Sequence, residues 1–175
     1  MVSIRTADIG DAGVLADLGR QTFHDTFADQ NKPEDMDAYM KAAFTVERLA
    51  AEVREPGAVY LLAETPPRVV GFAKVAPDDP PDCITAPSPL RLVKLYVSAD
   101  AIGSGVGAAL MRSSIERARN SGYESLWLGV WEHNDRARAF YERWGFMSVG
   151  AEVFRLGSDD QTDVVMQLTL TEKTA

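Results

Sequence analysis

The chain has 175 residues, of which 46% are hydrophobic and 25% charged, and these proportions are typical of a globular protein rather than a disordered one. Asp and Glu outnumber Lys and Arg by 26 to 18, and the resulting net charge of −8 argues against a protein that binds nucleic-acid phosphates. One cysteine excludes an intramolecular disulfide, two histidines offer little for a zinc site, and no apolar run is long enough to span a membrane. We therefore expect one cytoplasmic domain over residues 1–175, with no metal, nucleic-acid or membrane partner.

The N-terminal half is predicted to contain short strands and amphipathic helices. Asp11 is expected to cap the first helix, and Thr45 is expected to cap a later one. Residues 24–37 are an acidic, polar connection between them. The helices after this connection are predicted at 35–43 and 45–54. The predicted strands are apolar runs bounded by turn residues, at 2–7, 58–64 and 68–76, of which the last two form a hairpin.

The C-terminal half follows a proline-rich loop at 77–89 and alternates more clearly between strand and helix. A strand at 90–98, a helix at 103–120 and a strand at 125–131 predict a parallel β-α-β crossover. The remaining predicted elements are a helix from Asn134 to Gly145 and strands at 146–156 and 162–170. This order predicts a mixed α+β fold with a central, mostly antiparallel sheet and helices on both faces.

A glycine-rich turn begins the predicted helix at 103–120. Gly103, Gly105 and Gly107 allow a tight turn, and without Cβ atoms the backbone can approach a ligand closely. The first turn of a helix also presents unpaired N–H groups that bind phosphate. A Walker loop is excluded, because no Lys-Ser/Thr pair follows the glycines. A dinucleotide fingerprint with Glu124 as the ribose-binding acid stays open as the weaker alternative, since only one β-α-β unit is present.

A second motif follows the strand at 125–131. Residues 134–146 read Asn-Asp-Arg-Ala-Arg-Ala-Phe-Tyr-Glu-Arg-Trp-Gly-Phe. The pairing of this motif with the glycine turn resembles the GCN5-related N-acetyltransferases, the GNAT family, and the element order over residues 2–170 resembles the GNAT fold. Two segments, 23–44 and 126–170, are similar to the bacterial PaiA-type spermidine/spermine N-acetyltransferases.

The resemblance implies an enzyme that uses acetyl-CoA, and it assigns the residues of the donor site. Backbone groups of Leu95, Tyr96 and Val97 would bond the pantetheine arm, and one N–H there would polarise the thioester carbonyl. Asn134 would bond the pantetheine, and Tyr141 would protonate the leaving thiolate. The residues expected to wrap the pyrophosphate are those of the glycine turn: Gly103, Ser104, Gly105, Val106, Gly107 and Ala108.

On the acceptor side, the resemblance implies a small-molecule primary amine, and the acidic composition favours a polyamine such as spermidine or spermine. Many relatives carry a glutamate base on the strand predicted at 90–98, whereas this strand offers Lys94 and no acid. Glu132 is therefore the predicted base, with deprotonation through ordered water as an alternative. Asp25, Trp131 and Glu132 are expected to hold the cationic amine, together with the acidic connection at 24–37 and an acidic turn at 152–163.

The chain departs from the GNAT pattern just before the glycine turn. The family usually has Arg or Gln there, whereas this chain has Ile102, so Arg112, Arg138 or Arg143 would have to supply any positive charge. This departure and the missing strand acid keep a CoA-binding regulatory protein with weak or no catalysis open as an alternative. A nucleotide-dependent oxidoreductase is a third interpretation. The sequence is compatible with a monomer or a homodimer.

Overall fold

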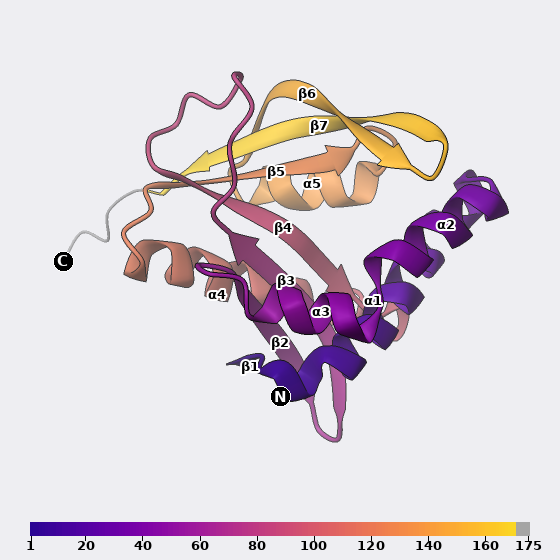
Figure 1. The fold of residues 1–175 in the computed structure, drawn as a ribbon. Helices are drawn as coiled ribbons and strands as arrows, with labels where there is room; N and C mark the ends of the chain where they lie inside the picture. Colours follow the sequence, from indigo (N-terminus) through magenta and orange to yellow (C-terminus); the bar gives the residue numbers. More distant parts are fainter. Residues whose placement is uncertain (171–175) are drawn as a thin grey trace.

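In the computed structural model, which describes residues 1–170, seven strands form one sheet (Figure 1). The strands are β1 Ser3–Thr6, β2 Val59–Thr65, β3 Arg68–Ala76, β4 Pro89–Val97, β5 Ser125–Trp131, β6 Met147–Leu156 and β7 Asp159–Thr169. They lie in the order β1-β2-β3-β4-β5-β7-β6, and every neighbouring pair is antiparallel except β4 and β5. The predicted mostly antiparallel sheet with one parallel crossover is confirmed.

Helices cover both faces of this sheet (Figure 1). The α-helices are α1 Ala12–Phe27, α2 Pro33–Ala43, α3 Val46–Val53, α4 Val106–Asn120 and α5 Asp135–Arg143. Short 3-10 turns are η1 Ile9–Asp11, η2 Ala28–Gln30 and η3 Ala99–Ala101. Helices α1, α2 and α3 pack on one face, whereas α4 and α5 pack on the other. No helix within residues 1–170 is both long enough and apolar enough to cross a membrane.

Strand residues alternate between two hydrophobic cores, one on each face. On β2, Tyr60 and Leu62 pack with helices α1, α2 and α3, whereas Leu61 and Ala63 pack with α4. All four residues are buried, which explains why the central strands are almost continuously apolar in sequence.

The start of α1 differs from the prediction that Asp11 caps it. Asp8 caps the preceding turn by accepting the Gly10 N–H at 2.7 Å. The Asp11 carboxylate accepts the Asp8 N–H at 2.8 Å and pairs with the Arg5 guanidinium, also at 2.8 Å. The guanidinium hydrogen bond holds the pKa of Asp11 below its usual range. The Asp11 side chain is therefore engaged elsewhere and forms no capping bond to α1.

The acidic connection predicted at 24–37 is mostly helical. Helix α1 continues through Phe27, whose ring centroid lies 4.6 Å from that of Phe23. Helix α2 begins at Pro33, a residue whose fixed φ suits the first helical turn. Burial of the aromatic face stabilises helix in this segment despite its polar composition, so only a short turn separates the two helices.

Strands β4 and β5 separate soon after they meet. Their parallel pairing covers three residue pairs and ends at Arg91 opposite Trp127. Beyond this point β4 pairs only with β3 as far as Val97, and β5 pairs only with β7 as far as Trp131. Both strands therefore leave backbone groups facing a gap in the middle of the sheet.

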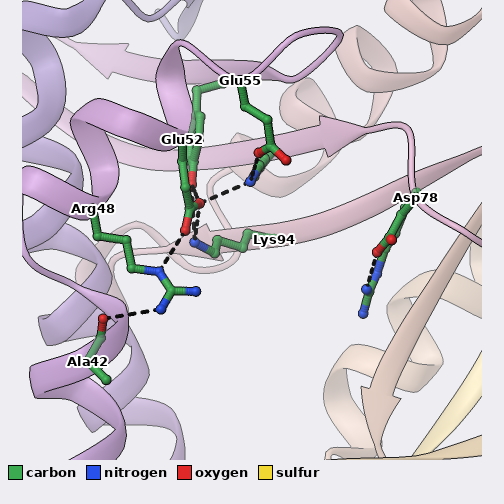
Figure 2. A network of polar contacts seen from close by, with 9 residues as sticks. Ala42, Arg48, Glu52, Glu55, Asp78 and Lys94 are labelled. Carbon is green, nitrogen blue, oxygen red and sulfur yellow. Dashed lines mark hydrogen bonds and ion pairs between the residues drawn. The ribbon is translucent and has the colours of Figure 1, made fainter.

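A buried carboxylate joins α3 to the strands β2, β3 and β4 (Figure 2). Glu52 Oε2 lies 3.0 Å from the Nζ atoms of both Lys74 and Lys94, and the Tyr60 hydroxyl donates to it. Arg48 donates to Glu52 Oε1 at 3.0 Å. The side chains of Lys74 and Lys94 are only 8% and 11% exposed, so Lys94 depends on Glu52 for its counter-charge, and Lys74 on Glu52 together with Glu55, which also lies 3.0 Å from its Nζ.

The shared carboxylate makes the fold sensitive to acid. Burial opposes ionisation of Glu52, but the charge of Lys94 and three hydrogen-bond donors outweigh it and lower the pKa of Glu52 to about 2. Burial lowers the pKa of Lys94, the charge and hydrogen bond of Glu52 oppose this shift, and the charge of the neighbouring Lys74 adds to it. The stabilisation from ionised Glu52 is present above the ordinary value of 4.5 and is lost as the pH falls from there towards 2.

Replacement of this carboxylate should destabilise the protein strongly. We expect Glu52→Gln to lower the free energy of unfolding by about 3 kcal/mol at pH 7, because Lys94 loses its counter-charge and Lys74 keeps only the half-exposed Glu55. Glu47→Gln, at an exposed position of the same helix, is the matched control and should change stability by less than about 0.5 kcal/mol. Urea unfolding measures the free energy of unfolding of both variants. The difference between wild type and Glu52→Gln should become smaller below pH 4.5. Equal stability of the two variants at pH 7 would contradict the argument.

Candidate functional site

The glycine-rich turn between β4 and α4 leaves a helix N-terminus open. Gly103 and Gly105 have φ angles of +84° and +90°, which other residues rarely adopt, and open space lies where their Cβ atoms would be. No side chain caps α4, and the Ala109 N–H is the one that bonds the Gly105 carbonyl. The N–H groups of residues 106–108 therefore lack helical acceptors, and an anion can reach them.

A cavity of about 580 Å³ lies in the gap between β4 and β5. Residues of α1 and α2 line it from one face of the sheet, and the glycine turn and α5 line it from the other. One cavity thus reaches from the glycine turn, through the gap, to the helices on the opposite face. Two ligands that enter from opposite faces would meet between the strands.

Only alternate backbone groups of β4 face this gap. The Ser98 N–H donates to the Val70 carbonyl at 2.8 Å, so by alternation the backbone of Tyr96 also faces β3. The N–H and C=O groups of Leu95 and Val97 then point towards the gap. The Tyr96 ring packs with the core on the α1 face, and the side chains of Leu95 and Val97 pack with the other core. Of the three predicted backbone positions, two present their polar groups to the cavity and one faces its strand partner.

Asn134 and Tyr141 line the cavity from α5. Asn134 caps that helix, since its Oδ1 accepts the Ala137 N–H at 3.2 Å, and its NH2 group stays available to a ligand. The Tyr141 ring packs edge-on against Phe146, at 5.7 Å between centroids, and its hydroxyl bonds no other residue in the described chain. Burial raises the pKa of Tyr141 to about 12, so the phenol stays protonated near neutral pH.

Aromatic rings form the part of the cavity wall that lies below α1 and α2. The rings of Phe27 and Trp131 meet edge-on at 5.8 Å, and those of Tyr39 and Phe154 at 5.3 Å. All four residues line the cavity. Trp131, which was predicted to contact the acceptor, is therefore in the cavity wall.

The structure does not bring Glu132 or Asp25 into the cavity lining. The Glu132 side chain is 45% exposed and lies 3.6 Å from the His133 ring, and Asp25 is 41% exposed. Strand β5 ends at Trp131, and Glu132 lies in the turn that follows it.

Among the described residues, the carboxylate that lines the cavity is Asp163 in β7. Asp163 is 9% exposed and is paired in register with Trp131 of β5 and Glu152 of β6. Burial, followed by the charge of Glu152, raises the pKa of Asp163 to about 6, and Arg91 opposes the shift. The sequence analysis placed this residue in the acidic turn at 152–163 that was expected to help hold a cation, but did not single it out. The sequence feature that could have indicated a buried carboxylate is the position of Asp163 directly before the apolar run at 164–166.

Positive charge near the glycine turn comes from α5. Ile102 lines the cavity, is 43% exposed and supplies no charge. Of the predicted substitutes, Arg143 lines the cavity, whereas Arg112 and Arg138 do not. Arg136 of α5, which was not predicted, also lines the cavity.

Two curated relatives extend over most of the chain. An uncharacterized N-acetyltransferase of Lactobacillus delbrueckii subsp. lactis is 33% identical over 153 residues, covering 87% of this chain and 88% of that protein. An uncharacterized N-acetyltransferase of Mycobacterium tuberculosis is 33% identical over 156 residues, covering 89% of this chain and 96% of the relative.

Solved structures share the fold. The PaiA N-acetyltransferase of Thermoplasma acidophilum, solved in complex with coenzyme A, has a TM-score of 0.78 at 18% identity, covering 97% of this chain and 99% of that one. YncA of Salmonella typhimurium, solved with acetyl-CoA, has a TM-score of 0.70 at 21% identity, covering 100% of this chain and 97% of that one. Residues 20–146, which include the glycine turn, the gap between β4 and β5, and α5, match the acetyltransferase (GNAT) family, and the chain belongs to that family of N-acetyltransferases.

Proposed function

We propose that this GNAT enzyme transfers the acetyl group of acetyl-CoA directly to a primary amine, with a polyamine such as spermidine as the acceptor. The observation that carries the proposal is the continuous cavity, which runs from the uncapped N-terminus of α4 through the gap in the sheet to a buried carboxylate. An anionic donor and a cationic acceptor can then approach the gap from opposite faces.

The residues on the α4 side fit a CoA thioester, which supplies an activated acetyl group when bound. The N–H groups of residues 106–108 offer the pyrophosphate several donors at the positive end of the helix dipole. Leu95 and Val97 offer strand-like backbone groups to the amides of the pantetheine arm, and the NH2 group of Asn134 adds a donor. One backbone N–H in the gap would polarise the thioester carbonyl.

Tyr141 is assigned to the leaving sulfur. Its pKa of about 12 lies about 3.5 units above that of a thiol, so complete transfer of its proton to the thiolate costs about 5 kcal/mol. We therefore assign the hydroxyl a first role as hydrogen-bond donor to the sulfur, which stabilises negative charge as the C–S bond breaks. Protonation is completed as the thiol product returns to water.

The α1 side suits a cation with an apolar stem. Tyr39 and Trp131 offer aromatic surface, and Asp163 offers a negative charge. The net charge of −8 also attracts polycations to the molecule as a whole. Asp25 and Glu132 lie outside the lining, so their effect on the acceptor would pass through solvent, and their roles stay predictions.

A side chain at the glycine turn should obstruct the donor site. We expect Gly105→Val to weaken CoA binding by about tenfold or more, because the valine would stand between the phosphate and the backbone donors. Gly122→Val is the matched control, since Gly122 has a φ of +82° and equally open space at the far end of α4. Both variants carry similar backbone strain, and calorimetry should find reduced CoA affinity only in Gly105→Val. Unchanged affinity in a folded Gly105→Val protein would remove the pyrophosphate assignment.

Removal of the Tyr141 hydroxyl should slow the chemical step. We expect Tyr141→Phe to lower kcat by about 10- to 1,000-fold with little change in the KM for acetyl-CoA, because the hydroxyl acts on charge that develops in the transition state. Tyr123→Phe, at a partly buried tyrosine outside the cavity, serves as the control. Thiol release from acetyl-CoA measures both. An unaltered kcat, with chemistry rate-limiting, would reduce Tyr141 to a packing residue.

The charge of the acceptor should matter most at low salt. We expect spermidine to exceed hexylamine in kcat/KM, and we expect this advantage to shrink as salt rises, because screening limits exposed charges to about 8 Å at physiological ionic strength. A salt series of the two specificity constants measures the effect. Equal efficiency at low salt would end the polyamine assignment and leave the acetyltransferase assignment intact.

A further inference from the structure

Asp163 and Glu152 form a pair of carboxylates on the face of the sheet that carries α1 and α2. The next residue along β7, Val164, packs with the opposite core, so by strand alternation Asp163 points to the α1 face. A Cβ atom at Gly129 of β5 would collide with Glu152 Oε1 and lie 3.3 Å from Asp163 Oδ2. Both carboxylates therefore occupy the space above Gly129, which has no side chain, beside the gap.

Asp163 differs from the half-buried Glu52 and the buried Asp35 in that its carboxylate has no internal partner. Glu52 is held by two lysines, and Asp35 accepts the N–H and the hydroxyl of Ser158 at 2.7 and 2.8 Å. The Asp163 carboxylate forms no hydrogen bond or ion pair with any other residue in 1–170, whereas its backbone pairs in the sheet. A buried carboxylate without a partner is costly, so its retention at the cavity wall indicates that a ligand supplies the partner.

The charged groups around Asp163 leave it free for that ligand. Glu152 on β6 repels it, and Arg91 on β4 attracts it. Arg91 is already engaged, at 2.6 Å with Asp78 and at 3.5 Å with Glu152. The charge of Asp163 also acts on two neutral phenols, those of Tyr39 on α2 and Tyr96 on β4. Burial is the chief cause that raises the pKa of each phenol.

We propose that Asp163 is the catalytic residue that takes a proton from the acceptor amine, an inference that rests on the proposed acetyl transfer. The bound ammonium gives one proton to Asp163 Oδ, which passes it to water. The freed nitrogen forms the N–C bond as the C–S bond of the thioester breaks. The second N–H proton leaves the nitrogen as the amide forms, and one proton reaches the thiolate, so the products are the amide, the thiol and one H⁺.

Glu152 acts through Asp163 as a positioning residue. Burial of the site, followed by the charge of Glu152, raises the pKa of Asp163 to about 6, so the carboxylate is ionised near neutral pH and still holds a proton better than an exposed aspartate does. Activity that depends on ionised Asp163 is present above this pKa and is lost as the pH falls through it. Removal of the Glu152 charge lowers the pKa of Asp163. The acid limb of the pH–rate profile, which is the fall in kcat as the pH drops, then moves to lower pH.

Four variants test this assignment with acetyl-CoA and spermidine between pH 5 and 9. We expect Asp163→Asn to lower kcat by about 100-fold and to abolish the acid limb near pH 6, with CoA affinity within about twofold of wild type. Glu152→Gln should keep most of the plateau rate and shift the limb by about one unit to lower pH. Asp160→Asn, an exposed carboxylate three residues away on β7, should leave the profile unchanged. Glu132→Gln tests the predicted alternative base.

Thermal unfolding gives a readout that does not depend on activity. The pKa of Asp163 is raised in the folded state, so its ionised form costs stability above pH 6 and this cost disappears as the pH falls towards 4. Asp163→Asn should therefore have a higher Tm than wild type at pH 8 and an equal Tm near pH 4. This result also shows that the variant is folded.

The outcomes separate the two proposals. If wild type is active and Asp163→Asn is equally active, the role of Asp163 is overturned and the acetyltransferase assignment stands. The same conclusion follows if Glu132→Gln, instead of Asp163→Asn, shows the 100-fold loss and the altered pH–rate profile. A change in the KM for spermidine alone, with an unchanged acid limb, also overturns the base role. Absence of transfer from acetyl-CoA to any amine by wild-type protein that binds CoA overturns both proposals.

Discussion

Strand β4 leaves β5 after three residue pairs, and the arrangement of the whole site depends on that separation. Peptide groups in the middle of a sheet are normally satisfied by a neighbouring strand, but here those of Leu95 and Val97 face a cavity. The separation also directs the end of β4 into the glycine turn, so that α4 starts with its N–H groups open beside the same gap. The proposed sites for the pantetheine arm, along β4, and for the pyrophosphate, at the start of α4, would thus both follow from one break in pairing.

The gap divides the chemistry between the two faces of the sheet. The glycine turn, Asn134 and Tyr141 belong to the α4 and α5 side, whereas the aromatic wall and Asp163 belong to the α1 and α2 side. An anionic thioester and a cationic amine therefore need not compete for one entrance. The acetyl group would be transferred between the strands, where a low dielectric strengthens the polar interactions that act on developing charge.

Two buried acids show how the fold treats charge differently for structure and for chemistry. Glu52 is satisfied by lysine, arginine and tyrosine donors, and it anchors α3 to the strands that support the site (Figure 2). Asp163 has no internal partner and lies opposite another carboxylate. The first arrangement adds stability, whereas the second reduces it at neutral pH. A site that costs stability in this way is expected where a group must bind or move a proton.

The sequence alone was sufficient for the fold class, the parallel crossover, the glycine turn and the helix of Asn134 and Tyr141, because all of these depend on local periodicity and spacing. It was not sufficient for the acidic connection, where packing of Phe23 and Phe27 extended a helix through a polar stretch. The sequence alone was also not sufficient to identify Asp163 as the carboxylate in the cavity wall. Glu132 follows the separated strand in sequence, yet it lies in an exposed turn outside the cavity lining, whereas Asp163 reaches the cavity through the register of β7 with β5. Pairing between strands distant in sequence places that carboxylate, and only the tertiary structure decides such pairing, because a shift of one residue would point every side chain of β7 to the opposite face.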